Sequence, residues 1–305
     1  MDNVLPISPG HAGPKTSGRR KPVQVIAVTA GKGGVGKTTI SINLALALGK
    51  MGRKTMLLDA DLGLANIDTQ LGLQPASNLS HVLAGECSLK DIVLPVYPGV
   101  ELIPAASGVT RMTELTAREQ AGVIGAFDEL TNDLEVLIVD NAPGISSSML
   151  RFSRAAHEVL VVVCDEPASI TDAYAVIKVL SRDHGVEHFN VLVNKTDNAK
   201  QGREVFSKIN RVAERFLDVT LNPIGEIPRD SYLQRSIQEQ AGVVLRYPGS
   251  ASAKAFHNLA KKTTAWPAPR SPGGHVEFFV ERTVAAAAGG DHVHNDSDPS
   301  SRLSP

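Results

Sequence analysis

The sequence predicts an α/β protein with three layers, in which a mostly parallel, twisted sheet is covered by helices on both faces. Short runs rich in Val, Ile and Leu recur along the chain, apolar on both faces like strands buried between two helical layers. Most runs are separated by enough residues for a crossover helix, which indicates parallel strands in right-handed βαβ units. A chain of 305 residues is long enough to bury a large core.

The expected elements follow this pattern from the first apolar run onward. A helix is expected over residues 38–50, ending near Gly52. Another helix is expected after Pro167, with Ser169 or Thr171 as its N-cap residue. The expected strands cover residues 23–30, 55–61, 100–106, 134–141, 159–166 and 189–196, with a weaker candidate at 222–228.

Composition divides the chain into four segments. Residues 1–21 lack periodicity and are expected to form a flexible arm, whereas residues 22–266 carry the strand and helix pattern of one domain. Residues 267–288 combine a Pro- and Gly-rich linker with a short amphipathic segment. Residues 289–305 are too polar to bury and are expected to be disordered.

The charge balance argues against several classes of protein. There are 31 Lys and Arg residues against 32 Asp and Glu residues, which gives no sign of a general nucleic-acid binder or a polybasic membrane anchor. No apolar run reaches the roughly 18 residues of a membrane span, and the polar N-terminus does not resemble a signal peptide. The two cysteines lack metal-ligand spacing, so a reducing, cytoplasmic location is expected.

A phosphate-binding loop is the most specific motif. GKGGVGKT, residues 31–38, fits the pattern G-x-x-x-x-G-K-[ST], with Gly31, Gly36, Lys37 and Thr38 at the fixed positions, between an expected strand and an expected helix. Glycines let several backbone N–H groups point at one anion, and the helix N-terminus adds its positive end. We expect Lys37 to reach the β- and γ-phosphates of a nucleotide and the Thr38 hydroxyl to bind Mg²⁺.

Three carboxylates follow strands at the same expected edge of the sheet. Asp59 and Asp61 end the strand at residues 55–61, and Asp140 lies at the end of the strand at residues 134–141. Ligands of α/β folds bind at the carboxyl ends of parallel strands, where a carboxylate can hold Mg²⁺. Capping of a loop is the alternative role for each Asp, but the phosphate loop on the same edge favours the metal site.

The motifs resemble a known family. With Lys32 included, the loop contains K-G-G-x-G-K-T, which is similar to the deviant Walker A motif of the MinD/ParA ATPases, and LLDADLGLANID and VDNAPG match that family's next two motifs in order. GECSLKDI, IPAASG, VVVCDEPASITDAYAVIKVL and GHVEFFVER resemble the flagellar-number regulators of the FlhG/FleN branch. The resemblance covers about residues 23–282. It implies a Mg²⁺-dependent ATPase with slow turnover, dimeric with ATP and monomeric with ADP.

The resemblance also implies roles for individual residues. Lys32 would cross a dimer interface to the partner's bound phosphate, and the alternative is a lysine in solvent. Asp61 would orient the attacking water, Asp59 would support Mg²⁺, and Asp140 would be the Walker B acid. The expected nucleotide contacts in the loop are Gly31, Lys32, Gly33, Gly34, Val35, Gly36, Lys37, Thr38 and Thr39.

Two interpretations are open for the stretch VLVNKTD, residues 191–197. It resembles the guanine-recognising N-K-x-D motif of GTPases, in which the Asp, here Asp197, accepts hydrogen bonds from the base. MinD-like proteins instead use an Asn at this strand end for adenine, which favours Asn194 on adenine and ATP over GTP. In a later loop Pro228 and Arg229 would line the adenine, with Arg229 either stacked on it or pointing to solvent.

The chain departs from the family pattern in two places. The family usually has Ser or Thr after the Walker B Asp, whereas this chain has Asn141, whose effect on hydrolysis is open. Many flagellar relatives carry an Asp-Gln-Ala-type motif near the N-terminus that stimulates a GTPase similar to the signal recognition particle. The arm here, MDNVLPIS, lacks that motif, which puts such stimulation in doubt.

Two surfaces are candidates for contacts with partners. The turn that carries Asp165, Glu166 and Asp172 could report the nucleotide state. In the C-terminal segment, a helix would place Val276, Phe279, Val280 and Val284 on one face. By resemblance this face would bind lipid when the ATP dimer forms, and the alternative is packing onto the protein's own body.

Taken with the resemblance, these features predict a MinD-like ATPase that regulates flagellar number or placement. The expected partners are a second copy of the chain, a flagellar GTPase of the FlhF type, switch-complex proteins or a transcription activator of the FleQ type. A peripheral contact with the inner face of the cell membrane is expected, and specific binding to nucleic acid is not. The alternatives are a division-site or chromosome-partition ATPase, or a nucleotide-dependent scaffold with little hydrolysis.

Overall fold

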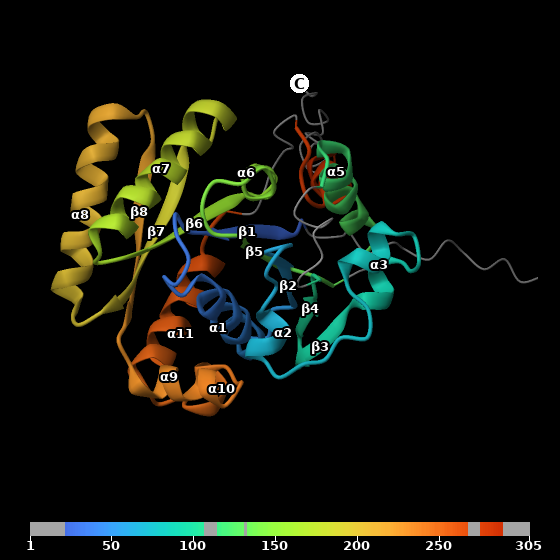
Figure 1. Cartoon of the computed structure of the whole chain (residues 1–305), viewed down its shortest axis with the longest axis horizontal. Helices are drawn as coiled ribbons and strands as arrows, with labels where there is room; N and C mark the ends of the chain where they lie inside the picture. Colours follow the sequence, from blue (N-terminus) through green and yellow to red (C-terminus); the bar gives the residue numbers. More distant parts are fainter. Residues whose placement is uncertain (1–21, 107–114, 131–132, 268–274, 289–305) are drawn as a thin grey trace, which may run out of the picture.

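A single eight-stranded sheet forms the centre of the molecule, in the order β3-β4-β2-β5-β1-β6-β7-β8 (Figure 1). The computed structural model describes residues 22–106, 115–130, 133–267 and 275–288. The arm at residues 1–21 and the tail at residues 289–305, for which flexibility was expected, lie outside the described residues. The strands are β1 (Gln24–Thr29), β2 (Thr55–Ala60), β3 (Leu94–Tyr97), β4 (Val100–Ile103), β5 (Val136–Asn141), β6 (Glu158–Cys164), β7 (His188–Thr196) and β8 (Thr220–Pro228).

Helices cover both faces of this sheet, so the predicted three-layer α/β class is confirmed (Figure 1). One face packs against α1, α10 and α11, and the other face packs against α6, α7 and α8. The helices are α1 (Lys37–Lys50), α2 (Ile67–Gln70), α3 (Leu79–Leu83), α5 (Ala117–Ala126), α6 (Ser147–Arg154), α7 (Pro167–His184), α8 (Ala199–Phe216), α9 (Ser231–Gln238), α10 (Val243–Arg246), α11 (Ala251–Thr264) and α12 (Val280–Ala288), and short 3-10 turns lie at Leu89–Ile92 and Phe127–Glu129.

Every expected strand is present, and β3 is an additional one. β3 runs antiparallel to β4, whereas the other neighbours in the sheet are parallel. Pro98 and Gly99 join the two strands, and Gly99 has φ 82°, a conformation that favours glycine. A Pro-Gly pair between apolar runs is a hairpin signal, so the sequence did contain the information for β3.

Both outer strands of the sheet have features that hinder further pairing. Pro95 is an exposed residue of β3 and has no N–H to donate. In β8, Pro223 likewise has no N–H to donate. The carbonyl of Ile224 already accepts a hydrogen bond from the Lys262 ammonium at 2.6 Å. Gly225, with φ 144°, adds an irregularity in the pairing of β8 with β7.

The N-cap predictions for the helix after Pro167 were wrong. α7 begins at Pro167 itself, with Glu166 as its N-cap residue, because proline suits the first turn of a helix, where its missing N–H removes no bond. Ser169 is buried inside the first turn, and its hydroxyl accepts a hydrogen bond from the backbone N–H of Cys164 at 3.0 Å.

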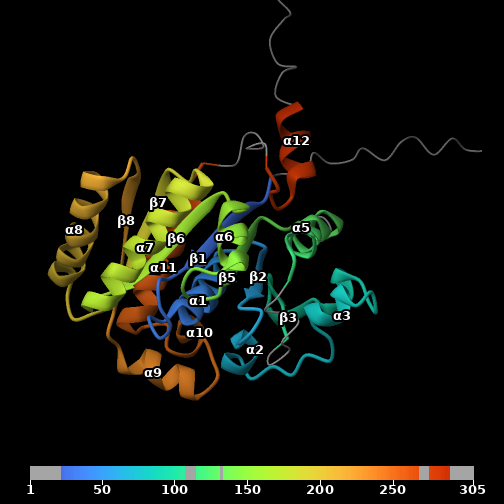
Figure 2. The same ribbon diagram turned by 45° about the horizontal axis from the view of Figure 1, so that its top comes forward.

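The C-terminal segment packs onto the body through two phenylalanines. The Phe278 and Phe279 side chains are fully buried, and the Phe127 ring contacts both, with centroids 5.0 and 5.8 Å apart. Phe152 of α6 stacks on Phe278 at 6.1 Å. Figure 2 shows α12 on the side of the molecule where α5 and α6 lie.

This packing corrects the expectation of one apolar helical face over this segment. The helix begins only at Val280, and Phe279 has φ 55°, outside helical geometry. Val276 and Val284 are exposed while Phe279 is buried, so these side chains do not form a common face. None of the helices in the described ranges is long and apolar enough to cross a bilayer.

We expect Phe278→Ala to lower the free energy of unfolding by about 3–5 kcal/mol, because it leaves a cavity beside the rings of Phe127 and Phe152. Urea denaturation of the full chain measures the change. Val276→Ala is the matched control, since Val276 is 53% exposed, and it should stay within about 0.5 kcal/mol of the wild type. Equal, small effects of both substitutions would show that the segment is not docked in solution.

Candidate functional site

The phosphate loop connects β1 to α1 and depends on glycine at two positions. Gly36 has φ 94°, and a Cβ atom there would lie 2.4 Å from the Asn194 amide nitrogen. At Gly31 a Cβ atom would lie 2.2 Å from the backbone carbonyl carbon of Asp172 in α7. No side chain among the described residues caps the first turn of α1, so its N–H groups are available to an anion.

Lys37 and Thr38, the first residues of α1, both bind Asp140 at the end of β5. The Lys37 ammonium lies 2.9 Å from Asp140 Oδ1, and the Thr38 hydroxyl donates to Oδ2 at 2.7 Å. Ser41, one turn further along α1, donates to Oδ1 at 2.7 Å. The Lys37 side chain is 7% exposed and that of Asp140 is 1% exposed, so the pair is nearly dry.

Ser41 is a site residue that was not predicted from the sequence. It stands four residues after Lys37, one helical turn away, which places both on the same side of α1. This spacing could have identified Ser41 as a site residue. A Walker B acid that contacts Lys37 also faces the residue one turn further along the helix.

Asp59 lies beside Asp140, because the two residues are in register on the adjacent strands β2 and β5. Asp59 Oδ2 accepts hydrogen bonds from the backbone N–H groups of Asn66 and Ile67 at 2.9 and 3.0 Å. Burial and the neighbouring Asp140 raise the pKa of Asp59 to about 7, although these hydrogen bonds and Lys37 oppose the shift. Two carboxylates, Asp59 and Asp140, therefore share a buried site with the ammonium group of Lys37.

This donor set fits Mg²⁺. Thr38, Asp59 and Asp140 offer hard oxygen atoms at one place, and Mg²⁺ is usually bound by one or two carboxylates together with phosphates and water. The described part of the chain contains no group of three or more His, Cys, Asp and Glu side chains that could hold a metal by themselves. Water or phosphate oxygens would therefore have to complete the coordination of an ion at this site.

Asp61 lies on the loop between β2 and α2, half-buried. Its N–H donates to Asp59 Oδ1 at 3.2 Å, and its Oδ1 accepts from the N–H of Leu64 at 3.3 Å. The structure therefore places it next to the Asp59 carboxylate, on a loop at the carboxyl edge of the sheet.

Lys32 lies on the outer side of the phosphate loop and forms an ion pair with Glu166. The hydrogen bond from Lys32 to Glu166 raises the pKa of the lysine and lowers the pKa of the carboxyl, and both side chains are partly exposed. Asp165, the neighbour of Glu166, instead binds α8 through Lys208 at 3.2 Å and Gln201 at 2.9 Å. The acidic turn is thus divided between the phosphate loop and α8.

Asn141 points away from the phosphate site, because successive strand residues face opposite sides of a sheet. Its amide donates to the Ser153 hydroxyl in α6 at 3.1 Å. Its Oδ1 atom is buried without a hydrogen-bond partner among the described residues. Asn141 therefore belongs to the layer of α6, and the hydroxyl that the family has here would lie on the side away from Lys37 and Thr38.

Asn194 and Lys195, at the end of β7, hold the backbone of the phosphate loop. The Asn194 amide donates to the carbonyl of Val35 at 2.7 Å, and the Lys195 ammonium donates to the carbonyl of Gly34 at 2.7 Å. Lys195 adopts φ 58°, which a non-glycine residue rarely does. This role of Lys195 was not predicted from the sequence.

Arg229 follows β8 and forms an ion pair with Asp197. The Arg229 Nε atom lies 3.1 Å from Asp197 Oδ1, and the N–H of Arg229 donates to the carbonyl of Thr196 at 2.8 Å. Pro228, half-buried, pairs with Thr196 in the register of β7 and β8. The two loops expected to surround a base therefore lie side by side.

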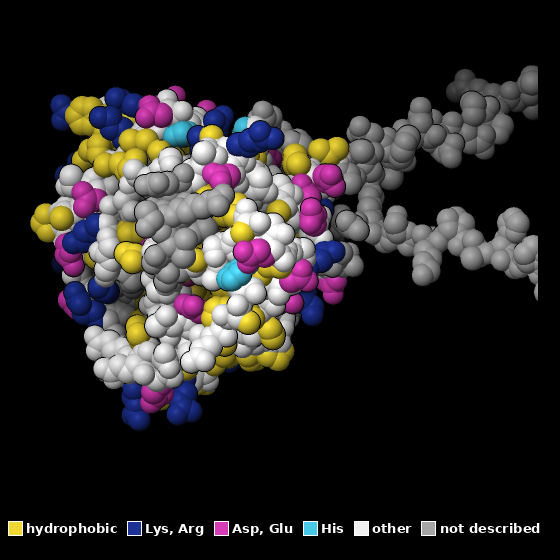
Figure 3. Space-filling view, turned by 45° about the vertical axis from the view of Figure 1, so that its right-hand side comes forward, with side chains coloured by type: hydrophobic (Ala, Val, Ile, Leu, Met, Phe, Trp, Pro, Cys, Tyr) yellow, Lys and Arg dark blue, Asp and Glu magenta, His cyan; other side chains and the backbone are white. Residues whose placement is uncertain are grey.

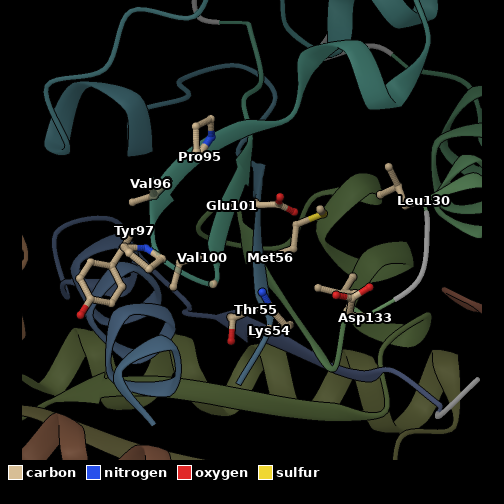
Figure 4. Close-up of a pocket in the computed structure, with 13 residues that line it drawn as sticks. Lys54, Thr55, Met56, Pro95, Val96, Tyr97, Val100, Glu101, Leu130 and Asp133 are labelled. Atoms are coloured by element: carbon tan, nitrogen blue, oxygen red, sulfur yellow. The ribbon is translucent and has the colours of Figure 1, made fainter. Parts of the chain in front are cut away.

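A cavity of about 560 Å³ lies at the opposite edge of the sheet (Figure 4). Lys54, Thr55 and Met56 at the start of β2 line it together with the β3–β4 hairpin and Asp133. Because the phosphate loop lies at the carboxyl ends of the strands, this cavity is separate from the site described above.

Comparison with known proteins identifies the family. The ParA family model, described as NUBPL iron-transfer P-loop NTPase, matches residues 21–264. The antiactivator FleN of Pseudomonas aeruginosa is 52% identical over 279 residues, which cover 92% of this chain and 100% of FleN. The flagellum site-determining protein YlxH of Helicobacter pylori is 33% identical over 241 residues, which cover 79% of this chain and 80% of YlxH.

Solved structures agree with this result. The septum site-determining protein MinD of Pyrococcus horikoshii, complexed with Mg-ADP, superposes with a TM-score of 0.66 at 27% identity, over 80% of this chain and 96% of that one. The chain belongs to the ParA family of P-loop NTPases, in the branch of flagellar regulators that includes FleN.

Proposed function

We propose that this protein is a Mg²⁺-dependent ATPase that switches between a monomer and an ATP-bound dimer and thereby regulates the number or placement of flagella. The different positions of its two loop lysines carry the proposal. Lys37 is buried against Asp140, whereas Lys32 lies outside the loop, partly exposed and paired with Glu166. A partly exposed lysine on the outer side would be accessible to a phosphate that another copy holds.

Within one copy, the phosphate loop and α1 would bind the triphosphate. The N–H groups of residues 31–39 would bind phosphate oxygens, and the Lys37 ammonium would turn from Asp140 to the β- and γ-phosphates. Thr38, Asp59 and Asp140 would hold Mg²⁺, which would supply positive charge to offset the charge of the phosphates. Asp61, next to Asp59, would accept a hydrogen bond from the attacking water and orient it.

Between copies, Lys32 would exchange Glu166 for the partner's phosphate. An exposed ion pair contributes only about 0–1 kcal/mol, so a phosphate with several negative charges can displace Glu166. Two nucleotides that face each other concentrate negative charge, and one lysine from each side would offset it. ATP would in this way join the two copies, and hydrolysis would release them.

Asn194, Pro228 and Arg229 would surround the adenine base. Their loops lie side by side next to the phosphate loop, which supports a base site there. The iron transfer in the family model's description finds no such support in this chain. Cys164 is buried beside the Val35 carbonyl, and Cys87 packs against a different part of the core.

The comparisons support a flagellar role over a division-site role. FleN, an antiactivator, is 52% identical, whereas a putative septum site-determining MinD of Guillardia theta is 33% identical. The proposed partners are a GTPase of the FlhF type, switch-complex proteins or an activator of the FleQ type. We place the protein in the cytoplasm, with a peripheral membrane contact when dimeric. Acidic and basic side chains are interspersed on the face shown in Figure 3, which does not favour DNA binding there.

Phosphate release with Mg-ATP tests the catalytic part of the proposal. Asp61→Ala should lower the rate by about 10²-fold or more, because the water loses its orienting acceptor, while ATP-dependent dimerisation remains. Asp183→Ala, which removes an exposed carboxylate of α7, should behave as the wild type. Equal rates for Asp61→Ala and the wild type would contradict the role of Asp61, and no release by the wild type would favour a scaffold.

A further inference from the structure

The sequence NKTD, residues 194–197, contains every side chain of a guanine-recognising motif, although the proposed substrate is ATP. Three of the four residues have a structural role of their own, apart from any contact with a base. Asn194 and Lys195 bind the phosphate-loop carbonyls, and Thr196 is buried in the sheet. Asp197 is the one member of the motif whose side chain only accepts hydrogen bonds, as the N–H groups of guanine require.

Asp197 is not a free carboxylate. Its Oδ1 atom lies 3.1 Å from Arg229 Nε, and both side chains are 62% exposed. The arginine is held at this position by its backbone, because its N–H donates to the Thr196 carbonyl at 2.8 Å. The register of β8 against β7, which ends with Pro228 opposite Thr196, therefore brings the arginine to the one carboxylate of the motif.

The ion pair between Arg229 and Asp197 affects base recognition because guanine and adenine present different hydrogen-bonding groups. Guanine presents N–H donors at N1 and at its 2-amino group, which suit a carboxylate because an ionised carboxylate only accepts hydrogen bonds. Adenine lacks both donors and has an acceptor at N1. A guanidinium only donates, so an arginine paired with the carboxylate competes with guanine for this acceptor and adds a donor that suits adenine.

We infer that Arg229 is a specificity-determining residue that masks Asp197 and so selects adenine over guanine nucleotides. This inference rests on the proposed ATP-binding function. The lysine and asparagine of the motif are retained for a separate reason, since they fix the backbone of the phosphate loop whichever base is bound. Base choice is thus set by the contact between the β7 and β8 loops and not by the motif alone.

The effect of unmasking is expected to be moderate. An ion pair this exposed is weak, and the freed carboxylate is also solvated, so Arg229→Gln should shift the ratio of GTP to ATP dissociation constants toward GTP by about five- to tenfold. Asp197→Asn alone should change the ratio less than about twofold, because the arginine already covers that group. Arg229→Gln combined with Asp197→Asn should lose the gain for GTP, because the amide in place of the carboxylate offers a donor as well as an acceptor.

Displacement of a fluorescent ADP analogue by ATP, GTP and ITP from the full-length protein with Mg²⁺ measures these ratios. ITP lacks the 2-amino group, so Arg229→Gln should gain less affinity for ITP than for GTP if Asp197 accepts from that group. Arg235→Gln is the control, since Arg235 of α9 has a similarly exposed side chain and pairs with Glu239 rather than with Asp197, and it should leave the ratio unchanged.

The outcomes separate this inference from the proposed function. A wild type that prefers ATP, together with an unchanged ratio in Arg229→Gln, overturns the masking role and leaves the ATPase proposal intact. If Arg229→Gln combined with Asp197→Asn still binds GTP more tightly than the wild type does, the masking role is also overturned. The Asp197 carboxylate would then not be the acceptor for guanine. A wild type that prefers GTP overturns both.

Discussion

Replacing Lys32 by alanine is expected to leave ATP binding largely intact while it abolishes ATP-dependent dimerisation and lowers hydrolysis by about 10²-fold or more. In its own chain Lys32 contacts Glu166 and not the buried Lys37–Asp140 group, so a bound nucleotide would lose few direct contacts. The variant would instead lose dimerisation, because it lacks the lysine proposed to offset the negative charge of the partner's phosphate. Nucleotide titration, sedimentation with ATP and phosphate release measure the three quantities separately.

Lys208→Ala provides the matched control for this experiment. Lys208 is also a partly exposed lysine in an ion pair with an acid of the same turn, Asp165, but it lies on α8. It should dimerise and hydrolyse ATP as the wild type does. Normal dimerisation of Lys32→Ala with ATP would contradict the proposed role of the outer lysine.

The second large effect concerns the stability of the nucleotide-free protein. Lys37→Met should lower the free energy of unfolding by about 3–5 kcal/mol, because it leaves a buried carboxylate without its charge partner. Asp140 is 1% exposed, and Asp59 lies in register beside it, so repulsion between the two carboxylates adds to the cost. Urea denaturation without nucleotide measures the change, and nucleotide titration should show that ATP binding is lost.

A double substitution separates the two consequences of losing Lys37. Lys37→Met combined with Asp140→Asn removes both charges, so it should recover a large part of the stability while ATP binding stays lost. If Lys37→Met unfolds at the same urea concentration as the wild type, the buried ion pair does not stabilise the free protein.

The strands and the phosphate loop could be predicted because each depends on local sequence. Buried parallel strands are continuous apolar runs, and the loop has fixed glycine and lysine positions. β3 was missed because Leu94–Tyr97 is short and partly exposed, and its only strong signal is the Pro-Gly turn that follows it. The start of α7 was misplaced because two hydroxyl residues competed with the proline that begins the helix.

The contacts of the site were harder to predict, because they join residues far apart in the chain. Lys32 and Glu166 are separated by 134 positions, and Lys37 and Asp140 by 103. The side of the sheet that Asn141 faces follows from the alternation of β5, but only once Asp140 is known to face α1. The pairing of Arg229 with Asp197 depends on the register of β8, which has irregularities that the sequence does not reveal.

The two outer strands have a consequence for how copies of this protein meet. An unprotected outer strand invites a second chain to extend the sheet, and such growth needs no nucleotide and has no natural end. Here Pro95 interrupts one border, and Pro223, Gly225 and the Lys262 ammonium interrupt the other. Uncontrolled polymerisation through the sheet is thereby disfavoured on both sides, which is compatible with the proposed ATP-dependent association through another surface.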